Sequence, residues 1–220
     1  MGVLNNYKKA HILIVGSGII GKFNALELSK LGFKITIANP QKSKNSSSAA
    51  LGLLISNMYQ KDKGRSWELR EKSNELWPKW IKIFHQYNKN LNIEKPLIQL
   101  TTDPAKFEKL RKFISHHPER DLKVLGKDSS IIQNIYKIFK VDNLQGVISN
   151  QDGRIDPISL LNTLDVFLKN KKINFINEEI IKIKNLNNQW ISTCSNALEI
   201  KSDVVILCNS LDANKLIDLN

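Results

Sequence analysis

The stretch that decides the fold is residues 11–40, HILIVGSGIIGKFNALELSKLGFKITIANP. An apolar run over residues 12–15 leads directly into the glycine pattern GSGIIG at residues 16–21. Apolar residues at helical spacing follow and stop at Gly32, before a second β-rich run over residues 34–38. A strand, a glycine turn, a helix and a strand within about thirty residues are the context in which this motif predicts dinucleotide binding.

Each glycine of the motif has a mechanical role. Gly16 permits the sharp turn, Gly18 lets the backbone approach a pyrophosphate, and Gly21 lets the helix pack closely on the sheet. The helix N-terminus, at Ile19 and Ile20, supplies backbone N–H groups and a partial positive charge for the pyrophosphate. The simpler alternative is an ordinary turn that contains glycine.

The position after the second strand departs from the usual pattern. Dinucleotide folds commonly place Asp or Glu there, about twenty residues after the glycines, to hold the ribose hydroxyls. Here this position is Asn39. Its amide offers a neutral hydrogen bond of about 0.5–1.5 kcal/mol in place of a charge-assisted bond of about 1.5–3 kcal/mol. We therefore expect Asn39 to contact the cofactor but to hold it more weakly than a carboxylate would.

The composition of the whole chain limits its size and its partners. With 220 residues, of which 41% are hydrophobic, the chain can bury a core and form one or two domains. Its formal net charge of +12 comes mostly from lysines scattered through every segment. Basic runs with interleaved aromatic residues, as a nucleic-acid groove requires, are not evident. We expect a solvated basic surface, no specific nucleic-acid partner, and only salt-sensitive sticking to polyanions.

Cysteine usage and hydropathy indicate the compartment. The two cysteines, Cys194 and Cys208, show neither metal-ligand spacing nor a disulfide framework, which fits a reducing cytoplasm. The N-terminus shows no signal peptide, and no apolar run approaches roughly eighteen residues, so no membrane span is expected. The sequence thus predicts a cytoplasmic protein without a metal site.

A segment of small residues follows the second strand after a polar loop. Its sequence is SSSAALGLL, residues 46–54. Small side chains let the backbone approach a ligand closely, and serine hydroxyls bond phosphate oxygens. A flexible serine-rich linker is the alternative, but residues 49–55 are too apolar for it.

Together these motifs resemble the D-amino-acid oxidase family, in its glycine oxidase-like branch. The resemblance rests on GSGIIG, on the 46–54 segment, and on a following helix that contains Leu76-Trp77-Pro78. It implies an FAD cofactor and the oxidation of small amines or amino acids. It also implies that the FAD pyrophosphate and flavin ring are lined by Ser47, Ser48, Ala49, Ala50, Gly52 and Leu53.

The rest of the chain alternates between helical and strand patterns. Residues 66–87 show helical spacing, and Pro78 is expected to kink or break this helix near Trp77. Asn187-Asn188 is expected to form a turn. Further helices are expected from Pro104, from about Asp128 and from Pro157, and strands over residues 96–101, 173–176, 180–184, 189–193, 198–200 and 204–207.

The DGRIDP sequence at residues 152–157 is also similar to the oxidase family, where it returns the chain from the substrate domain to the FAD domain. We favour a helix-capping role for Asp156 over a catalytic pair with Arg154. The expected fold class is α/β, a Rossmann-like FAD/NAD(P)-binding domain with an inserted partial α+β substrate domain. The FAD-binding domain is expected over residues 10–90 and 147–220, and the insertion over residues 91–146.

Two further contacts are implied by the resemblance. Backbone near Ile181 would meet the adenine, and residues 204–209 would form the strand whose end faces the cofactor. Relatives have glycine where this sequence has Asn209. We expect Asn209 to crowd the ribose and pyrophosphate or to adopt a positive φ, which asparagine tolerates better than most residues.

Relatives in this family are much longer than 220 residues. The part without a counterpart here completes the substrate-binding sheet and supplies an arginine for the substrate carboxylate, so no catalytic residue is assigned. We expect a truncated chain, with three origins open: a shortened protein, a gene fragment, or one half of a split enzyme with a partner chain.

Three functions stay open, and whether the chain is an enzyme is undecided. The first is an oxidase of small amines or amino acids, in which flavin takes a hydride from the substrate, water hydrolyses the imine, and dioxygen reoxidises the flavin. The second is a non-catalytic FAD-binding fragment. The third is an NAD(P)-dependent dehydrogenase, which the 46–54 segment disfavours by analogy.

Overall fold

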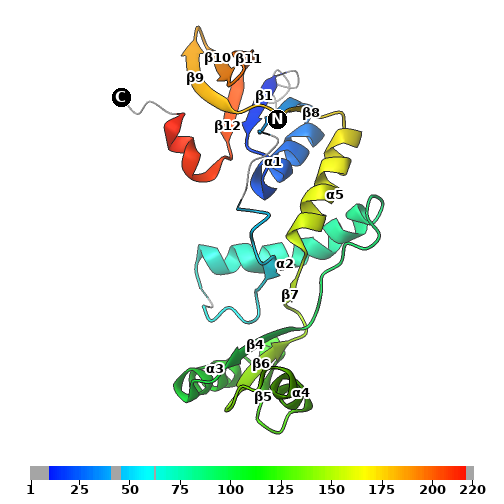
Figure 1. Cartoon of the computed structure of the whole chain (residues 1–220), viewed down its shortest axis with the longest axis vertical. Coiled ribbons are helices and arrows are strands. Elements are labelled where there is room, and N and C mark those ends of the chain that lie inside the picture. The colour runs from blue at the N-terminus through cyan, green and yellow to red at the C-terminus, as the bar shows by residue number, and fades with distance from the viewer. Residues whose placement is uncertain (1–9, 41–45, 62, 217–220) are drawn as a thin grey trace. The chain divides into compact units, whose positions relative to one another are not determined.

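The computed structural model describes residues 10–40, 46–61 and 63–216. Its contacts divide the chain into two compact units (Figure 1), a first unit of Met1–Ala50 with Pro157–Asn220 and a second unit of Leu51–Asp156. These two units are defined by contacts between residues and not by function. The functional domains expected over residues 10–90 with 147–220, and over 91–146, stay a prediction.

A four-stranded parallel sheet with the order β12-β1-β2-β8 forms the first unit's centre. β1 (His11–Val15) lies between β2 (Lys34–Ala38) and β12 (Val204–Leu207), and β8 (Asn174–Ile176) pairs with β2. Residues 12–15 are all buried, as expected for a strand covered on both faces of a parallel sheet. The predicted α/β fold is confirmed.

Two helices, α1 (Ile19–Lys30) and α5 (Pro157–Asn170), lie side by side in the first unit (Figure 1). The buried side chain of Lys22 joins them, because its Nζ donates to the Leu161 carbonyl at 3.1 Å and pairs with Asp165 at 2.7 Å. Burial lowers the pKa of Lys22, and its hydrogen bond to Asp165 opposes that shift. A paired lysine thus occupies an otherwise apolar helix contact.

An antiparallel three-stranded sheet of β9 (Ile180–Leu186), β10 (Gln189–Cys194) and β11 (Glu199–Ser202) completes the first unit. The turn between β9 and β10 is Asn187-Asn188, as predicted, with φ of 51° and 63°. Positive φ at both central residues suits a tight hairpin, and asparagine tolerates it. This sheet shares a core with the parallel sheet, formed by Leu13, Val15, Ala38, Ile180, Cys194 and Ile200.

The second unit is an α+β arrangement around an antiparallel sheet of the order β4-β6-β5. In α3, the side chain of Asp103 accepts hydrogen bonds from the N–H groups of Ala105 and Lys106, which caps the helix before Pro104. The elements of this unit are β3 (Leu53–Leu54), α2 (Arg65–Phe84), β4 (Leu97–Thr101), α3 (Pro104–His116), η2 (Pro118–Arg120), β5 (Leu122–Leu125), α4 (Ser130–Phe139), β6 (Gln145–Ser149) and β7 (Gly153–Arg154).

The long helix α2 runs through Pro78, so the break considered near Trp77 does not occur. A proline inside a helix removes one hydrogen bond and costs about 3 kcal/mol. Packing beyond the proline anchors the helix, since Phe84 is fully buried and stacks on Trp80 with ring centres 5.5 Å apart. Within the described ranges, no helix has both the length and the apolar composition needed to cross a bilayer.

Candidate cofactor site

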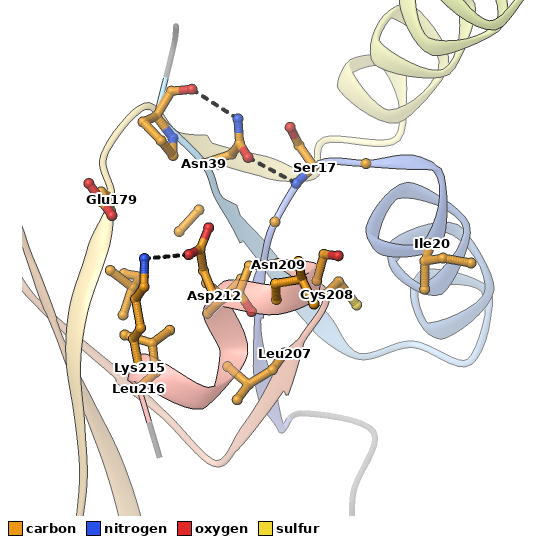
Figure 2. A pocket seen from close by; sticks show the side chains of 18 of the residues that line it. Ser17, Ile20, Asn39, Glu179, Leu207, Cys208, Asn209, Asp212, Lys215 and Leu216 are labelled. Carbon is orange, nitrogen blue, oxygen red and sulfur yellow. Dashed lines mark hydrogen bonds and ion pairs between the residues drawn. The ribbon is translucent and has the colours of Figure 1, made fainter. Parts of the chain in front are cut away.

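A cavity of about 810 Å³ lies at the carboxyl ends of β1, β2 and β12 in the first unit (Figure 2). Small-molecule and cofactor pockets are commonly about 300–1,000 Å³. In open α/β sheets, ligands bind outside the carboxyl ends of the parallel strands. Of the residues predicted from sequence, those that line this cavity are Gly16, Gly18, Ile20, Asn39, Ser47, Ile181 and Asn209.

Two of the three glycines of the motif, Gly16 and Gly21, lie where the backbone leaves no room for a side chain. Gly16 has φ of 108°, and a Cβ there would lie 2.6 Å from the carbonyl oxygen of Cys208. A Cβ on Gly21 would lie 2.0 Å from the carbonyl oxygen of Gly16. Both contacts are shorter than any side chain tolerates, so these glycines permit the turn and its close packing beneath α1.

The middle glycine leaves room for a neighbouring side chain. Gly18 is extended, with φ of −67°, and a Cβ there would lie 3.0 Å from the Ser47 hydroxyl oxygen. That hydroxyl accepts a hydrogen bond of 2.9 Å from the backbone N–H of Ile19, the first residue of α1. A serine hydroxyl accepts and donates at once, so Ser47 keeps a hydrogen for a phosphate oxygen.

Asn39 supports the glycine turn from the end of β2. Its Oδ1 accepts from the backbone N–H of Ser17 at 3.3 Å, and its Nδ2 donates to the carbonyl oxygen of Pro40 at 2.9 Å. The amide provides both an acceptor and a donor here, which a carboxylate would not. Asn39 therefore stabilises the glycine turn from the position where dinucleotide-binding folds commonly have a ribose-binding Asp or Glu.

Asn209 lies where β12 ends and the short helix η3 (Ser210–Lys215) begins. Its φ is −93°, so the expectation of a positive φ at this residue is wrong. The left-handed conformation falls on Ser210, with φ of 58°. The Asn209 Oδ1 atom is buried and has no hydrogen-bond partner among the described residues. Such an atom on a cavity wall fits a ligand that brings a hydrogen-bond donor.

Three charged residues on the cavity wall were not predicted from the sequence. Glu179 precedes β9, and Asp212 and Lys215 belong to η3 (Figure 2). Lys215 Nζ lies 2.6 Å from Asp212 Oδ1, and this bond raises the pKa of Lys215. In the sequence these residues are marked only by their positions: Glu179 precedes the strand expected over residues 180–184, and Asp212 and Lys215 follow the strand expected over residues 204–207.

Other predicted residues lie away from the cavity wall. Ser48, Ala49 and Ala50 are exposed and are not among the described residues that line it. Gly52 and Leu53 belong to the second unit, where β3 pairs with β7 and the Gly52 carbonyl accepts from the Ile155 N–H at 2.9 Å. Contact of these five residues with the cofactor stays a prediction.

Comparison with solved structures supports the fold. The iminodiacetate oxidase from Chelativorans sp. BNC1 superimposes with a TM-score of 0.77 at 17% identity, over 93% of this chain and 56% of that one. Glycine oxidase from Geobacillus kaustophilus gives 0.76 at 18% identity, over 94% of this chain and 58% of that one. Glycine oxidase from Bacillus cereus ATCC 14579 gives 0.74 at 18% identity, over 94% and 57%.

The chain thus spans less than two thirds of the length of these oxidases. No curated protein matches it significantly. The family described as FAD dependent oxidoreductase, DAO, matches residues 11–219, which is nearly the whole chain. The chain therefore belongs to the DAO family of FAD-dependent oxidoreductases.

Proposed function

We propose that this chain binds FAD in the first unit's cavity and belongs to an oxidase of small amines or amino acids. The observation that carries the proposal is the buried Oδ1 of Asn209, which has no hydrogen-bond partner in the described part of the chain and belongs to a residue that lines the cavity beside the glycine turn. The resident groups fit a dinucleotide, since this acceptor suits a ribose hydroxyl and the helix N-terminus suits a pyrophosphate.

Different groups on the cavity wall would contact different parts of FAD. Backbone at Gly18 and Ile20 and the hydroxyl of Ser47 would hold the pyrophosphate, because they combine N–H donors, an O–H donor and the positive end of α1. Asn39 would keep the glycine turn in its binding conformation through its bond to Ser17. Backbone near Ile181, a residue on the cavity wall, would meet the adenine.

The substrate class comes from the relatives. The solved structures include an iminodiacetate oxidase and glycine oxidases, which points to a small amine or amino acid as the substrate. When bound, FAD supplies the hydride acceptor, and dioxygen is the expected final oxidant. The predicted contacts of Ser48, Ala49, Ala50, Gly52 and Leu53 belong to this proposal.

A second candidate is an FAD-binding chain that is catalytic only with a partner chain, or not at all. Asn39 favours it, because its amide is already bonded to Ser17 and Pro40. Weak FAD binding without turnover is the behaviour that this candidate predicts.

Titration with FAD tests both candidates. We expect flavin absorbance to copurify with the protein or to appear on its reconstitution with FAD, and peroxide to form with glycine, sarcosine or a D-amino acid. FAD uptake without peroxide favours the second candidate. A protein that takes up no FAD contradicts both, and thermal stabilisation by NAD(H) alone would indicate a dehydrogenase instead.

A further inference from the structure

A second cavity, of about 350 Å³, lies wholly within the second unit. It is lined by β3 and Ile55, and by residues of α2 that recur three or four positions apart and so share one face of the helix. Of the described residues that line this cavity, one is cationic and none is acidic. The α2 residues that line it are Ser66, Leu69, Arg70, Ser73, Asn74 and Trp77.

Arg70 is the charged residue of this cavity, and it is held at two points. Its Nη1 donates to the Ile55 carbonyl oxygen at 3.2 Å, and its guanidinium carbon lies 4.3 Å from the centre of the Tyr59 ring. A guanidinium has five N–H donors, and Ile55 is their only acceptor among the described residues. Within the same residues, no Asp or Glu forms an ion pair with Arg70. Arg70 is thus a fixed cation with donors left for a ligand.

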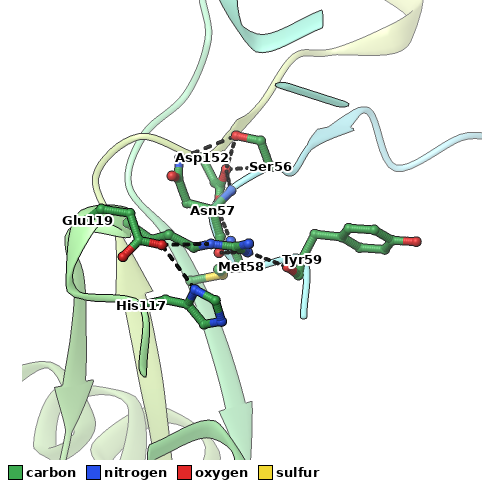
Figure 3. A network of polar contacts seen from close by, with 8 residues as sticks. Ser56, Asn57, Met58, Tyr59, His117, Glu119 and Asp152 are labelled. Carbon is green, nitrogen blue, oxygen red and sulfur yellow. Dashed lines mark hydrogen bonds and ion pairs between the residues drawn. The ribbon is translucent and has the colours of Figure 1, made fainter. Parts of the chain in front are cut away.

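The segment that anchors this guanidinium, residues 55–59, is itself fixed by buried polar groups (Figure 3). The fully buried Asp152 carboxylate accepts hydrogen bonds of 2.7 to 3.0 Å from the backbone N–H groups of residues 56–58. The buried Arg120 donates to the Tyr59 carbonyl oxygen at 2.6 Å. Charge-assisted bonds such as these are strong, so the cation in the cavity is in place before a ligand arrives. Preorganisation of this kind lowers the entropic cost of binding.

Hydroxyl groups and apolar surface lie beside the cation. Ser66 is four residues before Arg70 and Ser73 is three residues after it, so both are its neighbours on the helix face. A serine hydroxyl can donate to a carboxylate oxygen. Leu53 and Leu69, which also line the cavity, are 42% and 61% exposed. A ligand with an apolar body would remove this surface from water.

We propose that the cavity binds a small monocarboxylate with an apolar body. Arg70 would pair with the carboxylate, because the guanidinium fork matches its two oxygens, and the two serine hydroxyls would donate to the same group. A single cation balances a single negative charge, which favours a carboxylate over a doubly charged phosphate. This cavity shares no residue with the cofactor cavity of the first unit, so the inference does not depend on the proposed function.

Titration of the full wild-type chain with 4-methylpentanoate, followed by amide chemical shifts in NMR, tests the proposal. We expect saturable shifts in residues 53–55 and 66–77, and none in residues 12–15 of the first unit. The neutral isostere 4-methylpentanamide should bind at least about tenfold more weakly, because it cannot form the ion pair. Acetate should also bind more weakly, since it lacks the apolar body. Inorganic phosphate is the competing probe.

Three variants divide the contributions of the lining residues. Arg70→Gln should lower the affinity for 4-methylpentanoate by about tenfold, and Arg70→Lys by less, since lysine keeps the charge but not the fork. Arg65→Gln is the matched control, because Arg65 is exposed on the same helix and does not line the cavity. It should bind as the wild type does. Leu69→Ser should weaken 4-methylpentanoate but not acetate.

Several outcomes would overturn the proposal. One is the absence of saturable shifts in residues 53–77 at ligand concentrations well above about 1 mM. Equal affinity for the carboxylate and its amide, which needs no variant, excludes the ion pair. Equal losses in Arg70→Gln and Arg65→Gln would assign the effect to net charge and not to this cavity. Tighter binding of phosphate at the same residues would overturn the choice of a carboxylate.

Discussion

The hydroxyl oxygen of Ser47 accepts a hydrogen bond of 2.9 Å from the backbone N–H of Ile19, 28 residues earlier in the chain. Gly18, at the N-cap position of α1, has no side chain with which to cap the helix. Ser47 therefore does for α1 what an N-cap serine does in other helices, but from a separate segment. Ser47 also lines the candidate cofactor cavity, so the helix cap and the proposed phosphate contact would use the same side chain.

Ser47→Ala should lower both stability and FAD affinity. Loss of a capping acceptor costs about 0.5–2 kcal/mol, and the phosphate would lose one O–H donor. Urea unfolding and FAD titration measure the two effects. Ser47→Thr keeps the hydroxyl and should stay close to the wild type in both. An alanine variant that binds FAD as tightly as the threonine variant would show that this hydroxyl does not meet the cofactor.

Two glycine substitutions should have different consequences. Gly16→Ala combines a φ of 108° with a Cβ 2.6 Å from a backbone oxygen, so it should destabilise the fold by about 1–3 kcal/mol or more. Gly18→Ala has an ordinary φ of −67° and meets only the Ser47 side chain, so stability should change little while FAD binding weakens. Thermal denaturation and FAD titration separate them. Equal losses of stability would contradict this assignment of roles.

Ser210→Gly should stabilise the protein. Ser210 has φ of 58°, which costs a residue with a Cβ about 1–2 kcal/mol. Glycine removes that cost, but the greater freedom of the unfolded chain offsets about 0.4–1 kcal/mol of the gain, which leaves a net gain of up to about 1.6 kcal/mol. Urea unfolding measures the gain. Ser115→Gly, in the helix α3, is the control and should be destabilising, because glycine disfavours helices.

Lys22→Met should change how stability depends on alkaline pH. Burial lowers the pKa of Lys22 below 10.5, so the folded chain releases this proton at a lower pH than the unfolded chain. Between the two pKa values the unfolded state binds more protons, and the free energy of unfolding rises with pH. Unfolding measured across this window should show a smaller rise in Lys22→Met. The exposed Lys123→Met should keep the wild-type slope, and an unchanged slope in Lys22→Met would show that Lys22 does not titrate there.

Two buried serines should respond oppositely to alanine. Ser192 and Ser149 are both fully buried, but the Ser192 hydroxyl has no partner within the described part of the chain. Ser192→Ala should be neutral or stabilising by up to about 1 kcal/mol, since no hydrogen bond is lost. Ser149→Ala removes the acceptor for the Asp152 N–H and should cost about 1 kcal/mol. Chemical denaturation of both variants checks the sign, and a large loss in Ser192→Ala would reveal a partner for its hydroxyl.

The sequence by itself determined the β1-α1-β2 element and its glycine turn, because all of their defining residues lie within residues 11–40. It also predicted the helix that starts at Pro104 and the turn at Asn187-Asn188, where neighbouring residues supply the interaction. In each case the relevant energies are local, so spacing and residue type were enough.

Only the tertiary structure decided which distant residues share a site. Ser47 reaches the N–H of Ile19, and Asp152 binds the N–H of Ser56 from 96 residues away. Glu179 and Asp212 line one cavity because β9 and η3 come together there, and no local pattern encodes that meeting. These contacts depend on how packed elements bring polar groups together, whereas local spacing reports only which face of an element is apolar.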